Sequence, residues 1–145
     1  MKKFLLALSL LSLTGTAVSA DVLSDRKALM KERGQLTGAL SKVVKGEEAF
    51  DAAAVLATLQ AMQDNGARLD IDALYPEGSN SGDTTAAPAI WEDPDGFKAA
   101  EKTFQDAVEV AVADAPTDLD GLKAKFGPIG ASCGACHQTF RIRKD

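Results

Sequence analysis

The stretch LDGLKAKFGPIGASCGACHQTF, residues 119–140, carries the clearest helical pattern of the chain. Its apolar residues and cysteines alternate in steps of three and four, at Leu119, Leu122, Phe126, Ile129, Cys133, Cys136 and Phe140. This spacing places them along one side of an α-helix, as in the seam of a helical bundle. Thr117 or Asp118 can cap the start of that helix. The same stretch contains both cysteines and the single histidine of the chain, so the chemistry lies on the predicted core seam.

Three further segments upstream show the same helical pattern. The first begins near Val22, the second follows Asp51, and the third follows Asp93 and Pro94, which are favoured residues at helix starts. Their apolar positions are Leu29, Leu36, Leu40 and Val43, then Val55, Leu59, Met62 and Leu69, then Phe97, Phe104, Val108 and Ala111. GEEAF, residues 46–50, can turn the chain between the first two helices. No segment alternates convincingly as a strand, so the sequence predicts an all-α fold, an antiparallel four-helix bundle.

The connection between the second and third helices, residues 75–94, is long and will be called the long link. Its sequence, YPEGSNSGDTTAAPAIWEDP, is rich in Gly, Ser, Pro and Asp, and we expect it to be irregular. Ile90 and Trp91 near its end are expected to tie it to the bundle. Two interpretations stay open: a plain overhand connection between parallel second and third helices, or a segment that takes part in the functional site.

The first twenty residues have the pattern of a signal peptide. Lys2 and Lys3 precede an apolar run over residues 4–13 and a polar stretch that ends in AVSA, which predicts cleavage after Ala20 and a single mature domain of residues 21–145. The alternative, an N-terminal anchor, is weaker because the apolar run is shorter than the ~20 residues that a bilayer span needs. We therefore expect export, with no membrane insertion after cleavage.

The charge of the mature chain argues against nucleic acid as a partner. Residues 1–20 contain two lysines and no acidic residue, so their removal changes the formal net charge from −5 to −7. Proteins that bind nucleic acid usually present basic surfaces to the phosphate backbone. Export also places the chain in an oxidising compartment, where two cysteines would by default form a disulfide.

The pattern Cys-x-x-Cys-His at residues 133–137 is typical of covalent haem attachment, in which two thiols add to vinyl groups and the adjacent imidazole reaches the iron. On a helix, Cys136 lies three residues and His137 four residues beyond Cys133, so the three side chains share one side. We expect one haem c per chain, with thioether links from Cys133 and Cys136 and with His137 as an axial iron ligand.

Three alternatives explain the motif less well. A structural zinc site needs four ligands, and the chain has no further Cys or His to supply them. A redox-active dithiol of the thioredoxin type belongs near a β-α-β pattern, which is not seen here. A simple stabilising disulfide would not require the adjacent histidine.

The first helix carries an unusual ridge of Arg26, Met30, Gly34 and Gly38, spaced by four residues. A glycine inside a helix costs about 1 kcal/mol relative to alanine, so two of them on one ridge need a reason. One interpretation is close packing of a neighbouring helix, and the other is room for a flat macrocycle. The CGACH motif favours the second.

Over residues 21–145 the sequence resembles the cytochrome c′ family, four-helix bundles of the bacterial periplasm. The resemblance rests on DRKALMK, VVKGEEAFDA, YPEGS, AIWEDPDGF and GASCGACHQTFR, and on a haem motif that lies in the last helix. It implies a periplasmic electron-transport protein that binds small diatomic gases (NO, CO), exchanges electrons with a periplasmic redox partner, and forms a homodimer in many members.

The resemblance also implies roles for individual residues. His137 would be the proximal iron ligand, and Arg141 would lie beside it. Arg26 matches an arginine of the first helix near the haem propionates. Lys27 stands where the family often has glutamine, and we count it and Asp83 among the haem surroundings.

Met30 leaves two arrangements of the iron open. In cytochrome c′ the residue at this place covers the distal face without binding, so the iron is five-coordinate and high-spin; low-spin relatives use a methionine there as sixth ligand. Arg26 and AIWEDPDGF favour the first arrangement, with gas binding, over a low-spin electron carrier. We expect no enzyme activity, because a peroxidase would need a distal histidine as general base. Met62 is expected to be ordinary core packing.

Overall fold

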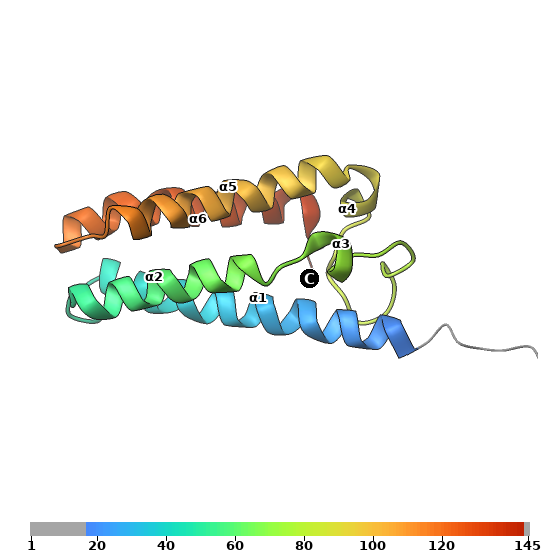
Figure 1. The fold of residues 1–145 in the computed structure, drawn as a ribbon, viewed down its shortest axis with the longest axis horizontal. Helices are drawn as coiled ribbons and strands as arrows, with labels where there is room; N and C mark the ends of the chain where they lie inside the picture. The colour runs from blue at the N-terminus through green and yellow to red at the C-terminus, as the bar shows by residue number, and fades with distance from the viewer. Residues whose placement is uncertain (1–16, 144–145) are drawn as a thin grey trace, which may run out of the picture.

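The computed structural model describes residues 17–143. In this part of the chain it contains six helices and no named strand: α1 (Ala17–Val44), α2 (Ala52–Ala67), α3 (Ile71–Leu74), α4 (Ala89–Glu92), α5 (Pro94–Ala113) and α6 (Leu119–Phe140). The four long helices lie side by side as a bundle, and the short helices α3 and α4 lie at one end of it (Figure 1). The predicted all-α four-helix bundle is confirmed, and the two short helices are additions that the sequence pattern did not predict.

Successive long helices run in opposite directions. In Figure 1, α1 and α5 run from right to left, and α2 and α6 run from left to right. Helix α1 packs against α2 and α6, and α5 packs against the same two helices. The interpretation of the long link as an overhand connection between parallel helices is therefore wrong. Because the link stays at the end where α2 finishes, α5 starts at that end and returns antiparallel to α2.

Aspartate side chains cap three of the long helices. The Oδ1 atom of Asp51 accepts a hydrogen bond from Ala54 N at 2.7 Å, and that of Asp93 accepts one from Gly96 N at 3.0 Å. Of the two candidates for the last helix, Asp118 is the cap, and its Oδ1 accepts from Gly121 N at 2.8 Å. These bonds satisfy backbone donors that have no partner within the helix, which explains why the helices begin here.

The N-terminal region agrees only in part with the prediction. Helix α1 begins at Ala17, five residues before Val22, where the sequence pattern placed its start. Most of the predicted signal peptide, residues 1–20, lies outside the described residues. None of the helices in the described part of the chain is both long enough and apolar enough to cross a membrane.

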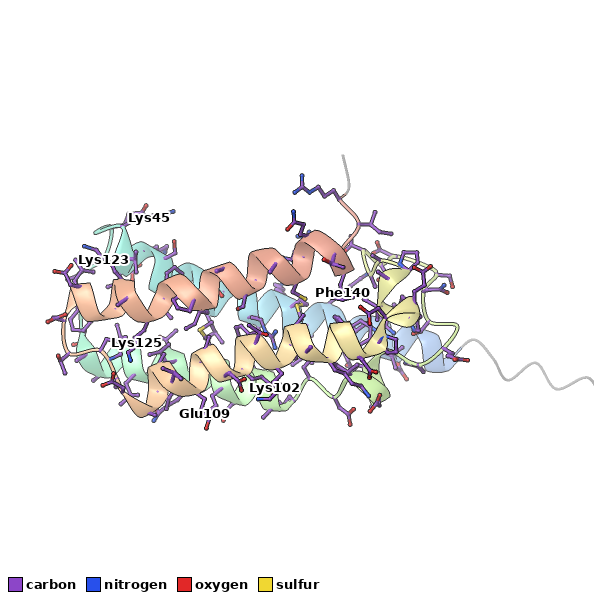
Figure 2. The ribbon with its side chains drawn as sticks, turned by 90° about the horizontal axis from the view of Figure 1, so that it is seen from above. Lys45, Lys102, Glu109, Lys123, Lys125 and Phe140 are labelled. Carbon is purple, nitrogen blue, oxygen red and sulfur yellow. The ribbon has the colours of Figure 1, made fainter. Side chains whose placement is uncertain are left out.

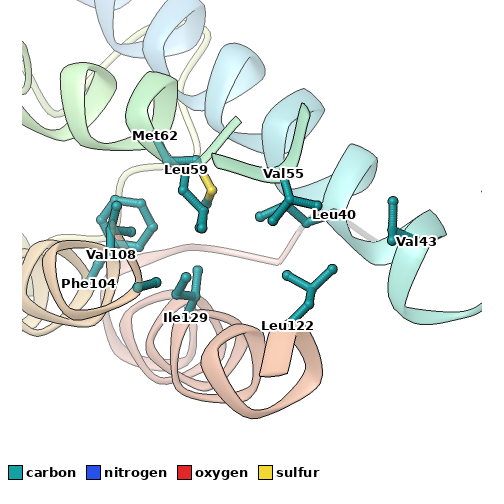
Figure 3. Packing of buried hydrophobic residues seen from close by; sticks show 10 residues of the cluster. Leu40, Val43, Val55, Leu59, Met62, Phe104, Val108, Leu122 and Ile129 are labelled. Carbon is teal, nitrogen blue, oxygen red and sulfur yellow. The ribbon is translucent and has the colours of Figure 1, made fainter. Parts of the chain in front are cut away.

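The hydrophobic core is divided along the bundle. Figure 2 shows Lys45 and Lys123 at one end and Phe140 near the other. The larger cluster, drawn in Figure 3, is formed by Leu40, Val43, Val55, Leu59, Met62, Phe104, Val108, Ala111, Leu122 and Ile129. A smaller cluster contains Ile90, Phe97 and Phe140. Cys133 packs against the larger cluster and Cys136 against the smaller, so the CGACH motif lies where the two parts of the core meet.

The long link is fastened to the bundle, as expected from its aromatic and aliphatic residues. Ile90 is 4% exposed and belongs to the smaller cluster. The indole Nε1 of Trp91 donates hydrogen bonds to the carbonyls of Tyr75 and Pro76, both at 3.1 Å. The link is not irregular throughout, however, because Ala89–Glu92 forms the single helical turn α4.

The middle of the long link also pairs with the chain just after α6. Ala87 N donates to Phe140 O at 3.0 Å, and Ile142 N donates to Thr85 O at 2.8 Å. Ala86 and Arg141 form an isolated antiparallel bridge between these hydrogen bonds. The link is thereby held against the end of the helix that carries the two cysteines and the histidine.

Candidate functional site

A cavity of about 800 Å³ lies between α1, α5, α6 and the long link. This volume is within the usual range of about 300–1,000 Å³ for small-molecule and cofactor sites. All eight residues that the sequence placed at the site lie in its wall: Arg26, Lys27, Met30, Asp83, Cys133, Cys136, His137 and Arg141. The long link contributes Asp83, Thr84, Thr85 and Ala86 to this wall, so of the two interpretations of the link, participation in the site is the one that the cavity supports.

The two cysteines of α6 are not joined by a disulfide and lie partly buried at the cavity wall. Burial is the main cause that raises the pKa of both, so both are predominantly protonated at neutral pH. Reactive dithiols instead have a lowered pKa, which makes the nucleophilic thiolate available. The environment of Cys133 and Cys136 therefore argues against the redox-dithiol alternative.

His137 lies in the same wall, one residue after Cys136. Partial burial of the imidazole lowers its pKa, and the positive charges of Arg141 and Arg33 lower it further. A lowered pKa keeps the imidazole neutral at pH 7, which is the form that can bind a metal through nitrogen. Arg141 follows the last residue of α6 in an extended conformation and lines the cavity with it.

A bare metal ion fits this site poorly. Among the described residues, no group of three or more His, Cys, Asp or Glu side chains could hold a metal ion. A structural zinc ion requires such a convergence of ligands. The donor set is instead two thiols and one imidazole on one helix, beside a large cavity.

The glycines of α1 border open space. A Cβ atom built on Gly34 or Gly38 would meet no heavy atom within 4 Å, and both residues line the cavity. Gly66 of α2 shows what close helix packing looks like, since a Cβ there would lie 3.3 Å from Gln105 Cγ. The helix-packing interpretation of the α1 ridge is therefore wrong, and the ridge borders the cavity as the second interpretation expected.

Arg26 is buried in the cavity wall, and its guanidinium is engaged by the chain near α3 and the long link. Its Nη1 donates to Ser79 O at 2.9 Å, its Nη2 to Ser79 Oγ, and its Nε to Leu74 O. The guanidinium carbon also lies 4.2 Å from the centroid of the Tyr75 ring, a cation–π arrangement. In this structure Arg26 thus fastens the link to α1.

Lys27 and Asp83 form an ion pair at the edge of the cavity, with 2.6 Å between Nζ and Oδ2. Their side chains are 51% and 78% exposed, so solvent screens the pair and its contribution to stability is small. The pair is a second contact between α1 and the long link.

Sequence reasoning missed a buried ion pair in the cavity wall, between Arg33 of α1 and Glu101 of α5. Arg33 Nη1 and Nη2 donate to Glu101 Oε2 and Oε1 at 2.7 and 2.8 Å. A signal was present, because Glu101 falls between Phe97 and Phe104 on the apolar side of its helix. A charged residue among core positions indicates a buried partner.

Two amides support this ion pair. Asn65 of α2 accepts a hydrogen bond from Arg33 Nε at 2.9 Å and donates to Leu29 O at 3.0 Å. Gln105 Nε2 donates to Glu101 Oε1 at 3.4 Å and to Gly66 O at 3.1 Å. The network therefore connects α1, α2 and α5 behind the cavity.

Comparisons with known proteins agree with this site. Residues 21–141 match the family described as Cytochrome C′. A protein of Agrobacterium tumefaciens (strain II Chrys) named cytochrome c-556 is 42% identical over 120 residues, which cover 82% of this chain and 95% of that protein. The solved structure of cytochrome c′ from Rhodobacter sphaeroides superposes with a TM-score of 0.81 at 31% identity, covering 87% of this chain and 98% of the other.

Structures of cytochrome c prime from Alcaligenes xylosoxidans are similar as well. One is a nitric oxide complex of a mutant, with a TM-score of 0.76 at 35% identity over 88% of this chain and 98% of that chain. A variant of the same protein has been solved with carbon monoxide bound. The arrangement of helices is thus shared with proteins in which a diatomic gas is bound.

Proposed function

This chain belongs to the cytochrome c′ family, and we propose that it is a periplasmic monohaem c-type cytochrome that transfers electrons and binds small diatomic gases. The observation that carries this proposal is the meeting of Cys133, Cys136 and His137 in one wall of a cavity of about 800 Å³. A periplasmic redox partner and a homodimer are further expectations from the family.

The residues present fit a haem c. Cys133 and Cys136 carry protonated thiols in adjacent turns of α6, suited to two thioether links, and neutral His137 would supply an axial nitrogen. Gly34 and Gly38 on the α1 side of the cavity border open space, which a flat group can occupy. The iron of such a haem supplies one-electron transfer and, where its sixth position is open, binding of a diatomic gas.

The protein's part is to hold and enclose this group. Arg26 and the Lys27–Asp83 pair fasten the long link to α1. The pairing of Thr85 with Ile142 fastens the link to the chain after α6. These contacts hold the long link against one end of the cavity.

Met30 decides between the five-coordinate form and a second candidate. It lies on α1 in the wall of the cavity that His137 lines from α6, and among the described lining residues it is the one methionine. We propose that Met30 covers the second face of the iron without binding, so that the iron is high-spin and five-coordinate and accepts nitric oxide or carbon monoxide. Complexes of such gases in the similar structures support this form.

The second candidate is a low-spin electron carrier in which the Met30 sulfur is the sixth ligand. The flexible thioether of Met30 is available in the cavity wall, and several relatives are named cytochrome c-556 rather than cytochrome c′. A methionine ligand raises the reduction potential and suits outer-sphere electron transfer.

The Met30→Ala variant tests both forms. If Met30 only covers the iron, the wild-type ferrous protein is high-spin, and the variant keeps that spectrum while carbon monoxide binds faster and more tightly. If Met30 is a ligand, the wild-type spectrum is low-spin and becomes high-spin in the variant. Visible and electron paramagnetic resonance spectra of both proteins, with a carbon monoxide titration, provide the measurement. Failure of both proteins to bind carbon monoxide would contradict gas binding. Met62→Ala, at a core methionine that does not line the cavity, is the control.

A further inference from the structure

The proposed function assigns no role to the ion pair of Arg33 and Glu101, which lies in the cavity wall. Both residues line the cavity, and they are only 8% and 6% exposed. The guanidinium donates bidentate hydrogen bonds to the carboxylate at 2.7 and 2.8 Å, a strong geometry for such a pair. One positive and one negative charge are thus held in the wall of the proposed haem site.

The two charges are fixed in position. Asn65 accepts from Arg33 Nε at 2.9 Å, and the Phe104 ring centroid lies 4.0 Å from the guanidinium carbon. Gln105 bonds to the carboxylate from the next turn of α5. Within the described residues, no buried side-chain nitrogen or oxygen lacks a hydrogen-bond partner. Such a locked network cannot rotate its dipoles to screen a charge that changes nearby.

Stability alone is a weak reason for this pair. Replacing a buried ion pair by apolar residues of similar volume is often neutral or stabilising. The location suggests an electrostatic role, because both charged side chains line the same cavity as Cys133, Cys136 and His137.

We propose that Arg33 and Glu101 act on the reduction potential of the haem with opposite and largely compensating effects, Arg33 raising it and Glu101 lowering it. The inference rests on the proposed function, since it needs a haem in this cavity. Reduction adds one electron to the site, so a fixed positive charge stabilises the reduced form and a fixed negative charge the oxidised form. Arg33 and Glu101 would act on the redox centre through space.

The proposal predicts shifts of opposite sign. Glu101→Gln leaves an unopposed positive charge and raises the reduction potential, and Arg33→Gln leaves an unopposed negative charge and lowers it. A unit charge about 10 Å from a redox centre, at an effective dielectric constant near 20, changes the redox equilibrium by about tenfold. For a one-electron couple this corresponds to about 59 mV. The double variant Arg33→Gln/Glu101→Gln returns close to the wild-type potential.

Two controls separate charge from structure. Arg33→Lys keeps the positive charge but loses the bidentate hydrogen bonds to Glu101. It therefore lowers the stability of the fold and leaves the reduction potential near that of the wild type. The exposed pair Lys102–Asp106, 2.6 Å apart on the same helix α5, is the matched control for charge removal (Figure 2 labels Lys102). Lys102→Gln and Asp106→Asn each shift the potential far less than the buried changes do, because solvent screens these charges.

The measurement is a spectroelectrochemical titration of the intact protein, with the haem content of each variant determined after denaturation. A wild-type protein without haem contradicts the proposed function. If the haem content is normal, two results overturn the inference. Either both single variants shift the reduction potential in the same direction, or they shift it no more than the Lys102 and Asp106 controls do. If one of the single variants does not fold, the other is still expected to shift the reduction potential in its predicted direction. An unchanged reduction potential in that variant overturns the inference as well.

Discussion

Arg26 of α1 donates a hydrogen bond from Nη1 to the backbone carbonyl of Ser79, 2.9 Å away across the end of the bundle. The same guanidinium donates hydrogen bonds to Ser79 Oγ and Leu74 O. A single buried cation therefore holds the end of α3 and the turn that follows it against α1. The pairing of the long link with the chain after α6 lies at the same end of the bundle. Arg26 is therefore a structural support of the proposed haem cavity.

Replacing Arg26 by Met should loosen the long link. Hydrogen bonds to charged groups contribute about 1.5–3 kcal/mol each, and the variant leaves buried carbonyls without their donor. We expect a loss of at least about 2 kcal/mol in the free energy of unfolding, with faster amide exchange at Ala87 and Ile142. Chemical denaturation and hydrogen exchange measure these effects. Lys27→Gln, which removes an exposed ion pair, should cost less than about 1 kcal/mol; equal losses in both variants would contradict the role of Arg26.

The buried pair of Arg33 and Glu101 also makes a prediction for stability. Glu101→Gln leaves the Arg33 guanidinium without its counter-charge, and breaking a buried pair in this way costs about 3–5 kcal/mol. Urea denaturation of the haem-containing protein provides the measurement. Asp106→Asn on the exposed face of α5 should change the free energy of unfolding by about 0.5 kcal/mol or less. A Glu101 variant as stable as this control would show that the pair is not buried in solution.

The open space beside Gly34 predicts that a larger side chain at this position reduces binding of the haem. A Cβ on Gly34 meets nothing within 4 Å and Gly34 lines the cavity, so the leucine of Gly34→Leu is expected to fill part of the cavity. We expect less haem per chain in Gly34→Leu than in the wild type, with the helix content retained. Haem content and circular dichroism measure this. Gly127→Leu, at an exposed glycine of α6 outside the cavity wall, should keep full haem content, and equal haem content in the two variants would contradict the prediction.

The local parts of the fold could be predicted from the sequence because they depend on neighbouring residues. Asp51 and Asp93 cap their helices as their positions indicated, and the step of three and four residues in α6 marked its buried side. The single turn α4 is too short to show a period. The direction of α5 depends on contacts of the long link with distant segments, such as Thr85 with Ile142, and no local pattern contains them.

The same distinction applies to the site. CGACH could be interpreted from the sequence because its three functional residues lie within five positions of one helix. The ion pair joins residues that are 68 positions apart, and Arg33 on its own is an ordinary helix residue. Glu101 among Phe97, Phe104 and Val108 was the one clue, and only the packing of α5 against the bundle shows what it pairs with.

The most direct test of covalent haem attachment is the state of Cys133 and Cys136 in protein isolated from the periplasm with its natural complement of haem. The intact mass and the visible spectrum are measured after full denaturation, followed by a titration of free thiols and extraction with acid acetone. Covalent attachment predicts a chain heavier by one haem, a haem spectrum that survives denaturation, and no free thiol. Haem that extracts into acid acetone, together with two free thiols or a disulfide, would contradict covalent attachment at the CGACH motif.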